Sequence, residues 1–193
     1  MVLIKKLLNE RKPEQIDDNG TSYKHAGVLI PIFVDNGEIK ILFTKRTRKV
    51  EHHKGQISFP GGAMDKEDLS EEQTALREAE EEIGLLRQDV ELLGRIDDTL
   101  TLASGFIVHP FVGVIPHPYK FTINEIEVER ILTVPLGVFH VKNPKRLVEF
   151  DGKVYLDEAY EYNGDLIWGA TARMMKNFME IIDNVSMNGD FIS

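Results

Sequence analysis

The chain has 193 residues, no cysteine and a formal net charge of −9. The absence of cysteine excludes disulfides, thiol catalysis and zinc–thiolate sites, and it fits a cytoplasmic protein. The acidic balance argues against a general nucleic-acid binder. No apolar run approaches the roughly 20 residues of a membrane span. With 42% hydrophobic and 28% charged residues, we expect a soluble globular protein that binds neither nucleic acid nor membrane.

The length fits one domain over residues 1–193, because no repeat or linker divides the chain. The first letters, MVLIKKLLNERK, have scattered apolar residues and no small-residue cleavage site. They predict a short amphipathic helix in an N-terminal extension over 1–24 rather than a signal peptide. The core of the domain is expected over about 25–183.

The first half of the chain predicts a hairpin followed by a basic segment. Residues 24–34, KHAGVLIPIFV, are β-rich and mostly apolar, as in a buried strand. The D-N-G sequence at 35–37 is a strong turn signal, so 39–43 is expected to return as the second strand. The basic segment 45–55 follows, and the P-G-G sequence at 60–62 ends a short extended stretch.

A helix is predicted from Ser70, where Ser70 and Gln73 form an S-x-x-Q capping box. Gly84 stands where a glycine would end it. Its apolar stripe consists of Leu76, Ala79 and Ile83. A second helix is predicted over 170–182. Further strands are expected at 90–96, 106–115, 147–150 and 154–162. The order of strands, helix, strands and helix predicts an α/β fold with a mixed sheet between helices.

Three carboxylates crowd one side of the first of these helices. Glu78, Glu81 and Glu82 lie roughly opposite the apolar stripe, within less than two helical turns. Like charges at i,i+4 repel, so the cluster makes most sense around a cation. Hard divalent ions take oxygen ligands of this kind and polarise phosphoryl oxygens. A solvated acidic helix face is the alternative, but the Gly-Gly turn and Arg77 nearby favour the metal site.

At this point a family resemblance is evident. Residues 61–85, GGAMDKEDLSEEQTALREAEEEIGL, resemble the Nudix hydrolase signature G-x5-E-x7-R-E-U-x-E-E-x-G-U, in which U is apolar. The matching positions of the second half are Arg77, Glu78, Ala79, Glu81, Glu82, Gly84 and Leu85. The first half departs, because Asp68 stands in place of glutamate and one extra residue separates it from Arg77. That insertion resembles the coenzyme A branch of the family.

Residues 42–62, LFTKRTRKVEHHKGQISFPGG, resemble the coenzyme A pyrophosphatase pattern L-L-T-x-R-[SA]-x3-R-x3-G-x3-F-P-G-G. The matching residues are Thr44, Arg46, Gly55, Phe59, Pro60, Gly61 and Gly62. Thr47 replaces the small residue, and Glu51 stands where arginine is expected. The second departure removes a positive charge that could face a polyanionic substrate. The segments SGFIVHPFVGVI and IWGATAR are also similar to that branch.

The resemblance covers about residues 25–180 and implies a Nudix-like α/β/α sandwich. It implies a hydrolase that uses Mg²⁺ or Mn²⁺ to cleave the diphosphate of coenzyme A or its derivatives to 4′-phosphopantetheine and 3′,5′-ADP. A homodimer is expected on family resemblance alone. Two alternatives stay open: another substrate, such as ADP-ribose, NADH or a dinucleoside polyphosphate, and a ligand-binding regulatory module. The three retained carboxylates disfavour the second alternative.

Carried over by position, the resemblance assigns metal binding to Glu78, Glu82 and Glu81, with Glu81 as a third ligand or a base. Arg77 is expected to orient the glutamates by a charge-assisted hydrogen bond. The family often takes a further carboxylate from outside the helix. If residues 124–129 are extended, Glu125, Glu127 and Glu129 share one side of the strand. Glu127 is favoured as base or extra ligand, and an exposed acidic strand edge is the alternative.

The basic segment carries five Lys or Arg residues and two histidines within residues 45–54. A cradle for substrate phosphates is the functional interpretation, and a solvated loop is the alternative. We expect substrate contacts from Arg46, which matches the motif, and from Lys49 and Lys54. Gly61 and Gly62 are expected to let the chain turn closely beside the helix that carries Glu78, Glu81 and Glu82.

Overall fold

The computed structural model describes residues 1–18, 20, 23–47, 55–101, 104–141, 144–150 and 152–186. Its helices are α1 (Val2–Glu10), α2 (Glu71–Ile83) and α3 (Ala170–Ser186), with short 3-10 turns η1 (Arg87–Asp89) and η2 (Leu136–Phe139). Its strands are β1 (Lys24–Asp35), β2 (Glu38–Arg46), β3 (Ile57–Ser58), β4 (Gly61–Ala63), β5 (Glu91–Arg95), β6 (Thr99–Leu100), β7 (Phe106–Val114), β8 (Val128–Pro135), β9 (Lys145–Phe150), β10 (Lys153–Tyr162) and β11 (Asp165–Trp168).

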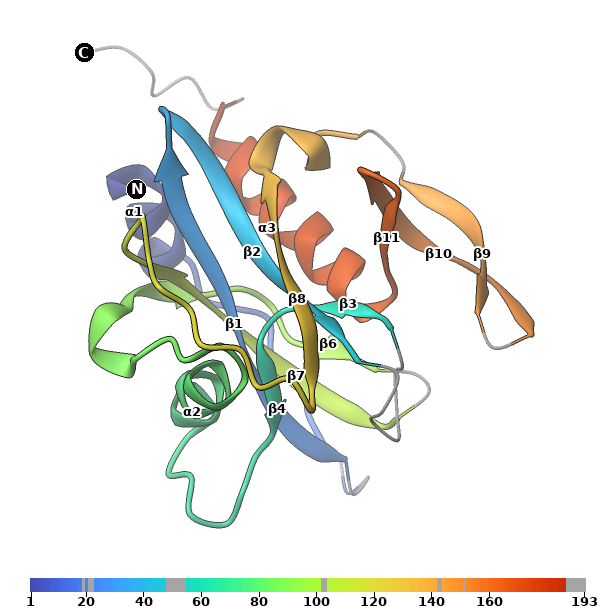
Figure 1. Cartoon of the computed structure of the whole chain (residues 1–193), viewed down its shortest axis with the longest axis horizontal. Coiled ribbons are helices and arrows are strands. Elements are labelled where there is room, and N and C mark those ends of the chain that lie inside the picture. The colour runs from blue at the N-terminus through green and yellow to red at the C-terminus, as the bar shows by residue number, and fades with distance from the viewer. Residues whose placement is uncertain are drawn as a thin grey trace.

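The main sheet has the strand order β3-β2-β1-β7-β5, with β4 paired to β1, β6 to β7 and β8 to β2. Strands β1 and β7 run parallel, whereas β1 pairs antiparallel with β2 and with β4. A second sheet with the order β11-β10-β9 lies at one side of the molecule, where the β9–β10 hairpin projects (Figure 1). The predicted mixed sheet is therefore confirmed.

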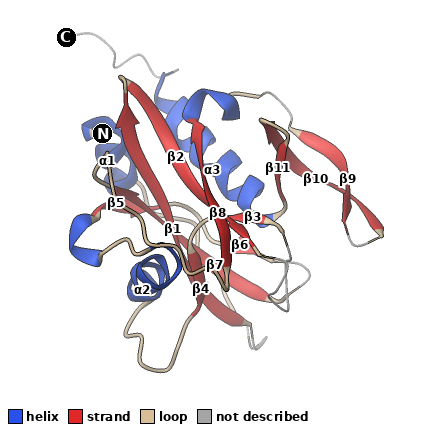
Figure 2. Cartoon of the chain, viewed as in Figure 1, coloured by secondary structure: helices blue, strands red, loops and turns tan. Residues whose placement is uncertain are grey.

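Helices cover both faces of the main sheet (Figure 2). Side chains alternate along β1, as a strand buried on both faces requires. Leu29 and Phe33 pack in the core beneath α2. Ile30 and Ile32 pack in the opposite core, together with side chains of α1 and α3. The molecule is thus an α/β/α sandwich, and α2 lies alone among the described helices on its face of the sheet.

The predicted hairpin is confirmed, and its turn has a simple cause. Asn36 and Gly37 connect β1 to β2 with φ angles of 50° and 81°. Two consecutive left-handed residues make a type I′ turn, which matches the twist of the flanking strands. Residues 124–129 do not meet the condition of an extended segment, because residues 125–127 form a turn and β8 begins only at Val128. Backbone pairing with β2, far away in sequence, makes β8 a strand.

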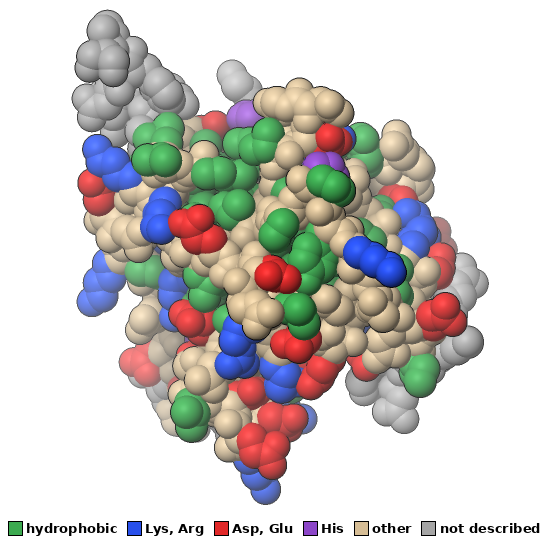
Figure 3. Space-filling model, turned by 60° about the vertical axis from the view of Figure 1, so that its left-hand side comes forward, with side chains coloured by type: hydrophobic (Ala, Val, Ile, Leu, Met, Phe, Trp, Pro, Cys, Tyr) green, Lys and Arg blue, Asp and Glu red, His purple; other side chains and the backbone are tan. Residues whose placement is uncertain are grey.

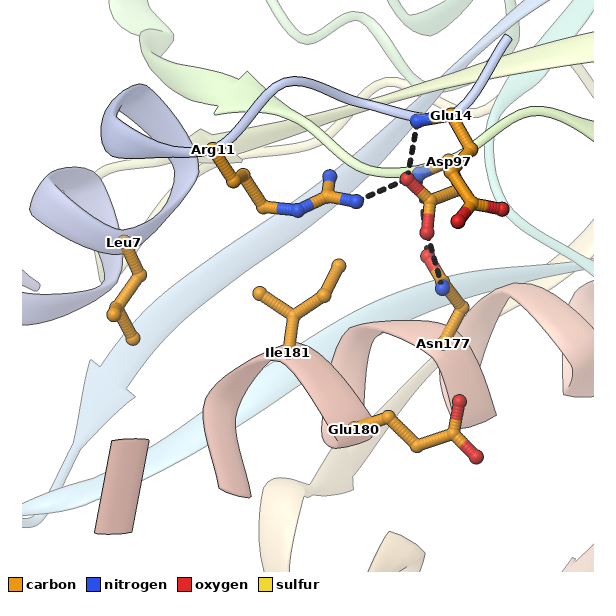
Figure 4. Close-up of a pocket in the computed structure, with 7 residues that line it drawn as sticks. All are labelled: Leu7, Arg11, Glu14, Asp97, Asn177, Glu180 and Ile181. Carbon is orange, nitrogen blue, oxygen red and sulfur yellow. Dashed lines mark hydrogen bonds and ion pairs between the residues drawn. The ribbon is translucent and has the colours of Figure 1, made fainter. Parts of the chain in front are cut away.

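The predicted N-terminal helix is also confirmed, and Ile4 and Leu8 bury it in the core that contains α3. Beyond it, Arg11 forms an ion pair with Asp97, and Asn177 of α3 donates a 2.7 Å hydrogen bond to the same carboxylate (Figure 4). These contacts border a hollow of about 470 Å³ on the sheet face opposite α2. No helix in the described part of the chain is long and apolar enough to cross a membrane.

Candidate active site

Local signals fix both ends of α2. The Ser70 hydroxyl accepts a hydrogen bond from the Gln73 N–H at 3.3 Å. The Gln73 side chain accepts from the Leu69 N–H at 3.1 Å, one residue before the cap, so only one half of the predicted capping box forms as expected. Gly84 ends the helix in the left-handed region with φ 67°. The buried stripe of Leu76, Ala79 and Ile83 is confirmed.

Two glycines of the sheet let α2 come close. Gly27 of β1 and Gly62 of β4 are cross-strand partners. A Cβ on Gly27 would lie 2.8 Å from the Ala75 nitrogen and would overlap the Glu71 carbonyl oxygen. A Cβ on Gly62 would lie 2.5 Å from Glu78 Oε1 and 2.6 Å from Oε2. The glycine pair therefore admits the helix backbone at one end and the Glu78 carboxyl at the other.

Arg77 connects the carboxylates of this region. Its guanidinium donates to Asp68 through Nε at 3.1 Å and Nη2 at 2.9 Å. Its Nη1 donates to Glu78 Oε1 at 2.8 Å and to Glu81 Oε2 at 3.1 Å. The hydrogen bonds from Arg77 hold the pKa of Asp68 well below its usual range. Asp68 thus anchors the arginine that orients Glu78.

Asp68 is a site residue that was not predicted, although its position in the first half of the signature is the signal that could have found it.

Glu82 is the most deeply buried carboxylate of the site, with 1% of the residue exposed. Its Oε1 lies 3.4 Å from Arg46 Nη1, and its buried Oε2 has no hydrogen-bond partner among the described residues. Burial raises the pKa of Glu82 to about 8, while Arg46 lowers it and the charges of Glu78 and Glu127 raise it further. Burial also raises the pKa of Glu78, and Arg77 opposes that shift.

Of the three carboxylates at 125–129, the structure brings Glu127 to the helix. Its carboxylate accepts a 3.2 Å hydrogen bond from the Asn124 side chain, and the Asn124 N–H donates to the Glu82 carbonyl at 2.9 Å. The Glu127 charge contributes to the raised pKa of Glu82. Glu125 and Glu129 are exposed. A turn, not strand alternation, separates the three side chains.

The basic segment begins and ends beside the site. The Arg46 N–H donates to the Gln56 carbonyl at 2.9 Å, so the two ends of the segment meet. Gly61 pairs with β1, and a Cβ on it would lie 2.5 Å from the Gly27 carbonyl oxygen. Lys49, Glu51 and Lys54 lie outside the described residues.

The chemistry of the donors around α2 suits a divalent cation. Glu78, Glu82 and Glu127 offer partly or fully buried carboxylate oxygens, and Glu81 adds an exposed one. The orphaned Glu82 Oε2 and the pKa values of Glu78 and Glu82, which burial raises, are what a cation would relieve. Hard divalent ions bind such oxygen sets. In Figure 3, acidic and basic side chains gather in the lower part of the molecule, at the height of α2 in Figure 1.

Comparison with known proteins agrees with this geometry. The NUDIX domain family matches residues 23–155. The chain is 36% identical over 169 residues to the uncharacterised Nudix hydrolase NudL of Photorhabdus laumondii, a match that spans 84% of this chain and 86% of that protein.

Two solved structures share the fold. A MutT/nudix family protein from Enterococcus faecalis has a TM-score of 0.58 at 12% identity, over 95% of this chain and 70% of that one. The NUDIX domain of Shewanella oneidensis NrtR, solved with ADP ribose, has a TM-score of 0.50 at 20% identity, over 63% and 79%. The chain therefore belongs to the Nudix hydrolase family, whose members act on nucleoside diphosphate derivatives and generally use divalent metal ions.

Proposed function

We propose that this enzyme cleaves the diphosphate of coenzyme A or a coenzyme A derivative, giving 4′-phosphopantetheine and 3′,5′-ADP. The observation that carries the proposal is the similarity of residues 42–62 to the coenzyme A pyrophosphatase pattern. This segment borders the carboxylates of α2. It contains β3 and most of β2, its Arg46 contacts Glu82, and its final glycine lies against Glu78. The residues that select the substrate would then lie next to the carboxylates that take part in the reaction.

The roles of the carboxylates follow from their surroundings. Glu78 and Glu82 are proposed to hold Mg²⁺ or Mn²⁺, with Glu81 as a further ligand. A divalent cation, when bound, stabilises charge on phosphoryl oxygens and lowers the pKa of coordinated water. Arg77 holds the Glu78 carboxylate in place and is itself held by Asp68, which gives the site a fixed geometry.

Glu127 is proposed as the general base. Its carboxylate would accept a proton from the attacking water while the water oxygen forms a bond to one phosphorus and the P–O–P bond breaks. The second phosphate leaves on its own oxygen, so the products are two phosphate monoesters. A carboxylate in this role must lie within hydrogen-bond reach of the water, and the Asn124 hydrogen bond orients it.

Arg46, Lys49 and Lys54 are proposed to bind the substrate phosphates. Gly61 and Gly62 are proposed to let β4 lie close to α2. Lys49 is three residues beyond Arg46 and Lys54 is two residues before Gln56. The Arg46–Gln56 hydrogen bond brings the residues that flank this segment together beside the site. The basic residues compensate for Glu51, which stands where the pattern has arginine.

A substrate panel tests the proposal. Coenzyme A, dephospho-coenzyme A, ADP-ribose, NADH and a dinucleoside polyphosphate are compared with Mg²⁺ and Mn²⁺, with the products resolved by mass. We expect the highest kcat/KM for coenzyme A or an acyl derivative, and 4′-phosphopantetheine as a product. ADP-ribose is a real competitor, since the NrtR domain of the same fold was solved with it. A higher kcat/KM for ADP-ribose would overturn the assignment.

The lysines have their own control. Replacing Lys49 and Lys54 together by alanine should raise KM for coenzyme A by about tenfold, and less for dephospho-coenzyme A, since the 3′-phosphate adds charge. Lys66→Ala removes one exposed lysine from the loop before α2 and should leave both KM values unchanged. Equal effects of the double variant on both substrates would refute contact with the 3′-phosphate.

A further inference from the structure

A second group of potential metal ligands lies beneath the first turn of α2. His25 of β1, His109 of β7 and Glu71 of α2 each offer one ligand atom, and these three atoms all lie within 4.8 Å of one another. Within the described part of the chain, no other group of three or more acidic or histidine side chains is so close. The carboxylates of Glu78 and Glu82 belong to the site already described and stand further along the helix.

The sheet creates this cluster. Strands β1 and β7 are parallel neighbours, with Gly27 opposite His109 and His25 opposite Ile107. His25 and Gly27 lie on the same face of β1, which is the face beneath α2, since a Cβ on Gly27 would meet Glu71. The absence of a side chain at Gly27 lets the first turn of α2, which carries Glu71, lie against this part of the sheet.

A buried carboxylate fixes the tautomer of His109. Its Nδ1 lies 2.8 Å from Asp98 Oδ1, and the Asp98 side chain is 1% exposed and also paired with Arg95. Because the carboxylate is an acceptor, it favours the proton on Nδ1, which leaves Nε2 as the nitrogen with a lone pair for a metal. A metal-binding imidazole usually donates a hydrogen bond from its other ring nitrogen to a carboxylate, as His109 does to Asp98.

The lone pair of His109 Nε2 faces the other two candidates. It lies 2.9 Å from His25 Nδ1 and 4.0 Å from Glu71 Oε1. The two rings are nearly parallel, with 9° between their planes. His109 is buried, whereas His25 and Glu71 are partly exposed, so the group is open to solvent on one side.

We propose that His25 Nδ1, His109 Nε2 and Glu71 bind a transition-metal ion of the Zn²⁺ class. Two imidazoles and one carboxylate form a ligand set that Zn²⁺ takes in proteins, with water in the remaining position. The set differs from the all-oxygen set around Glu78, which suits Mg²⁺ or Mn²⁺. Seven residues, or about 10 Å of helix, separate Glu71 from Glu78, so the two ions would be distinct.

Such an ion would connect β1, β7 and the first turn of α2. It would therefore brace the helix that carries Glu78 and Glu82 without taking part in the reaction. In the absence of metal, His25 and His109 share an N–H···N hydrogen bond, and the metal would replace it because it needs the same two ring nitrogens. This inference does not depend on the identity of the substrate.

The test uses the full chain, freed of metal with EDTA and then saturated with Mg²⁺. Zn²⁺ binding is measured by competition with a chromophoric chelator, and the imidazole nitrogens are followed by ¹H–¹⁵N NMR. We expect one Zn²⁺ per chain, shifts of the His25 and His109 resonances, and a higher Tm. His25→Gln and Glu71→Gln should each weaken binding by at least about tenfold.

Glu72→Gln is the matched control, because Glu72 is an exposed acid in the same first turn of α2. His140→Gln controls for loss of any histidine, since His140 is exposed and lies outside the cluster. Neither should change the Zn²⁺ affinity. Circular dichroism verifies that each variant is folded. If His25→Gln unfolds, the Glu71→Gln variant tests the proposal, because Glu71 is partly exposed and its replacement should not unfold the protein. Unchanged affinity in Glu71→Gln, or Zn²⁺ binding that leaves both imidazoles unperturbed, would overturn the proposal.

Discussion

Gly62 and Glu78 occupy complementary space. A Cβ on Gly62 would lie 2.5 Å from one carboxylate oxygen of Glu78 and 2.6 Å from the other. The glycine does not adopt a left-handed φ, so its need is for space rather than for backbone freedom. The side chain that would move belongs to the metal site proposed above, and this relationship can be tested directly.

Gly62→Ala should lower kcat by about a hundredfold, because the methyl group displaces the Glu78 carboxylate by an ångström or more. Stability should change little, since the displaced group is the end of a flexible side chain. Gly137→Ala is the control: a Cβ there meets nothing within 4 Å, and Gly137 has no left-handed φ. Steady-state kinetics with saturating Mg²⁺ and thermal melts give both quantities. Wild-type turnover in Gly62→Ala would contradict the assignment of Glu78.

Asp68→Asn should lower both stability and activity, the latter on the order of tenfold, because Arg77 loses its bidentate partner. Arg77 lowers the pKa of Asp68 in the folded state, so the stabilisation is present above the unfolded value of 3.8 and is lost as the pH falls below it. Glu67→Gln removes the same charge from an exposed neighbour. The Tm difference between the two variants should therefore shrink as the pH falls from 7 toward 3.

Glu82 predicts a pH dependence of the opposite sign. Burial raises its folded-state pKa from 4.5 to about 8, so the folded state binds the proton more tightly than the unfolded state. In EDTA, the free energy of unfolding should fall as the pH rises from about 4.5 to 8, by up to about 1.4 kcal/mol per pH unit. Glu82→Gln should remove this slope and abolish most turnover. Denaturant melts between pH 5 and 8 measure it, and parallel curves for both proteins would refute it.

Glu127→Gln should reduce kcat by a factor of about 10² to 10⁴, the range for loss of a general base. Glu125→Gln, two residues away and exposed, should stay within about twofold of wild type, because the mutation only removes a charge that the solvent screens. Equal losses in the two variants would point to a general electrostatic effect instead.

Features coded by nearby residues were predictable from the sequence. The cap at Ser70, the left-handed Gly84 and the buried face of α2 each depend on side chains within one or two helical turns. The D-N-G turn and the hairpin it closes are local in the same sense. Helical spacing alone also places Glu78 and Glu82 on one side of α2, and the charge of Glu78 contributes to the raised pKa of Glu82.

Features that depend on distant segments were not predictable. Strand β8 needs β2 as a partner, and Glu127 reaches the helix through a turn that an alternating pattern cannot reveal. His25 and His109 meet only because β1 and β7 are parallel neighbours. No periodicity in a single chain encodes such a register.

The Gly27–Gly62 pair has a consequence for how this protein can change. The spacing between α2 and the sheet and the position of the Glu78 carboxylate are linked, because the glycines that permit them, Gly27 and Gly62, are cross-strand partners. A side chain added at either glycine would therefore act on the chemistry although every carboxylate residue of the sequence is unchanged. The outer side of the helix, with exposed Glu72 and Glu80, carries no such coupling. Substitutions and attached labels on that side of the helix should therefore leave the active site unchanged.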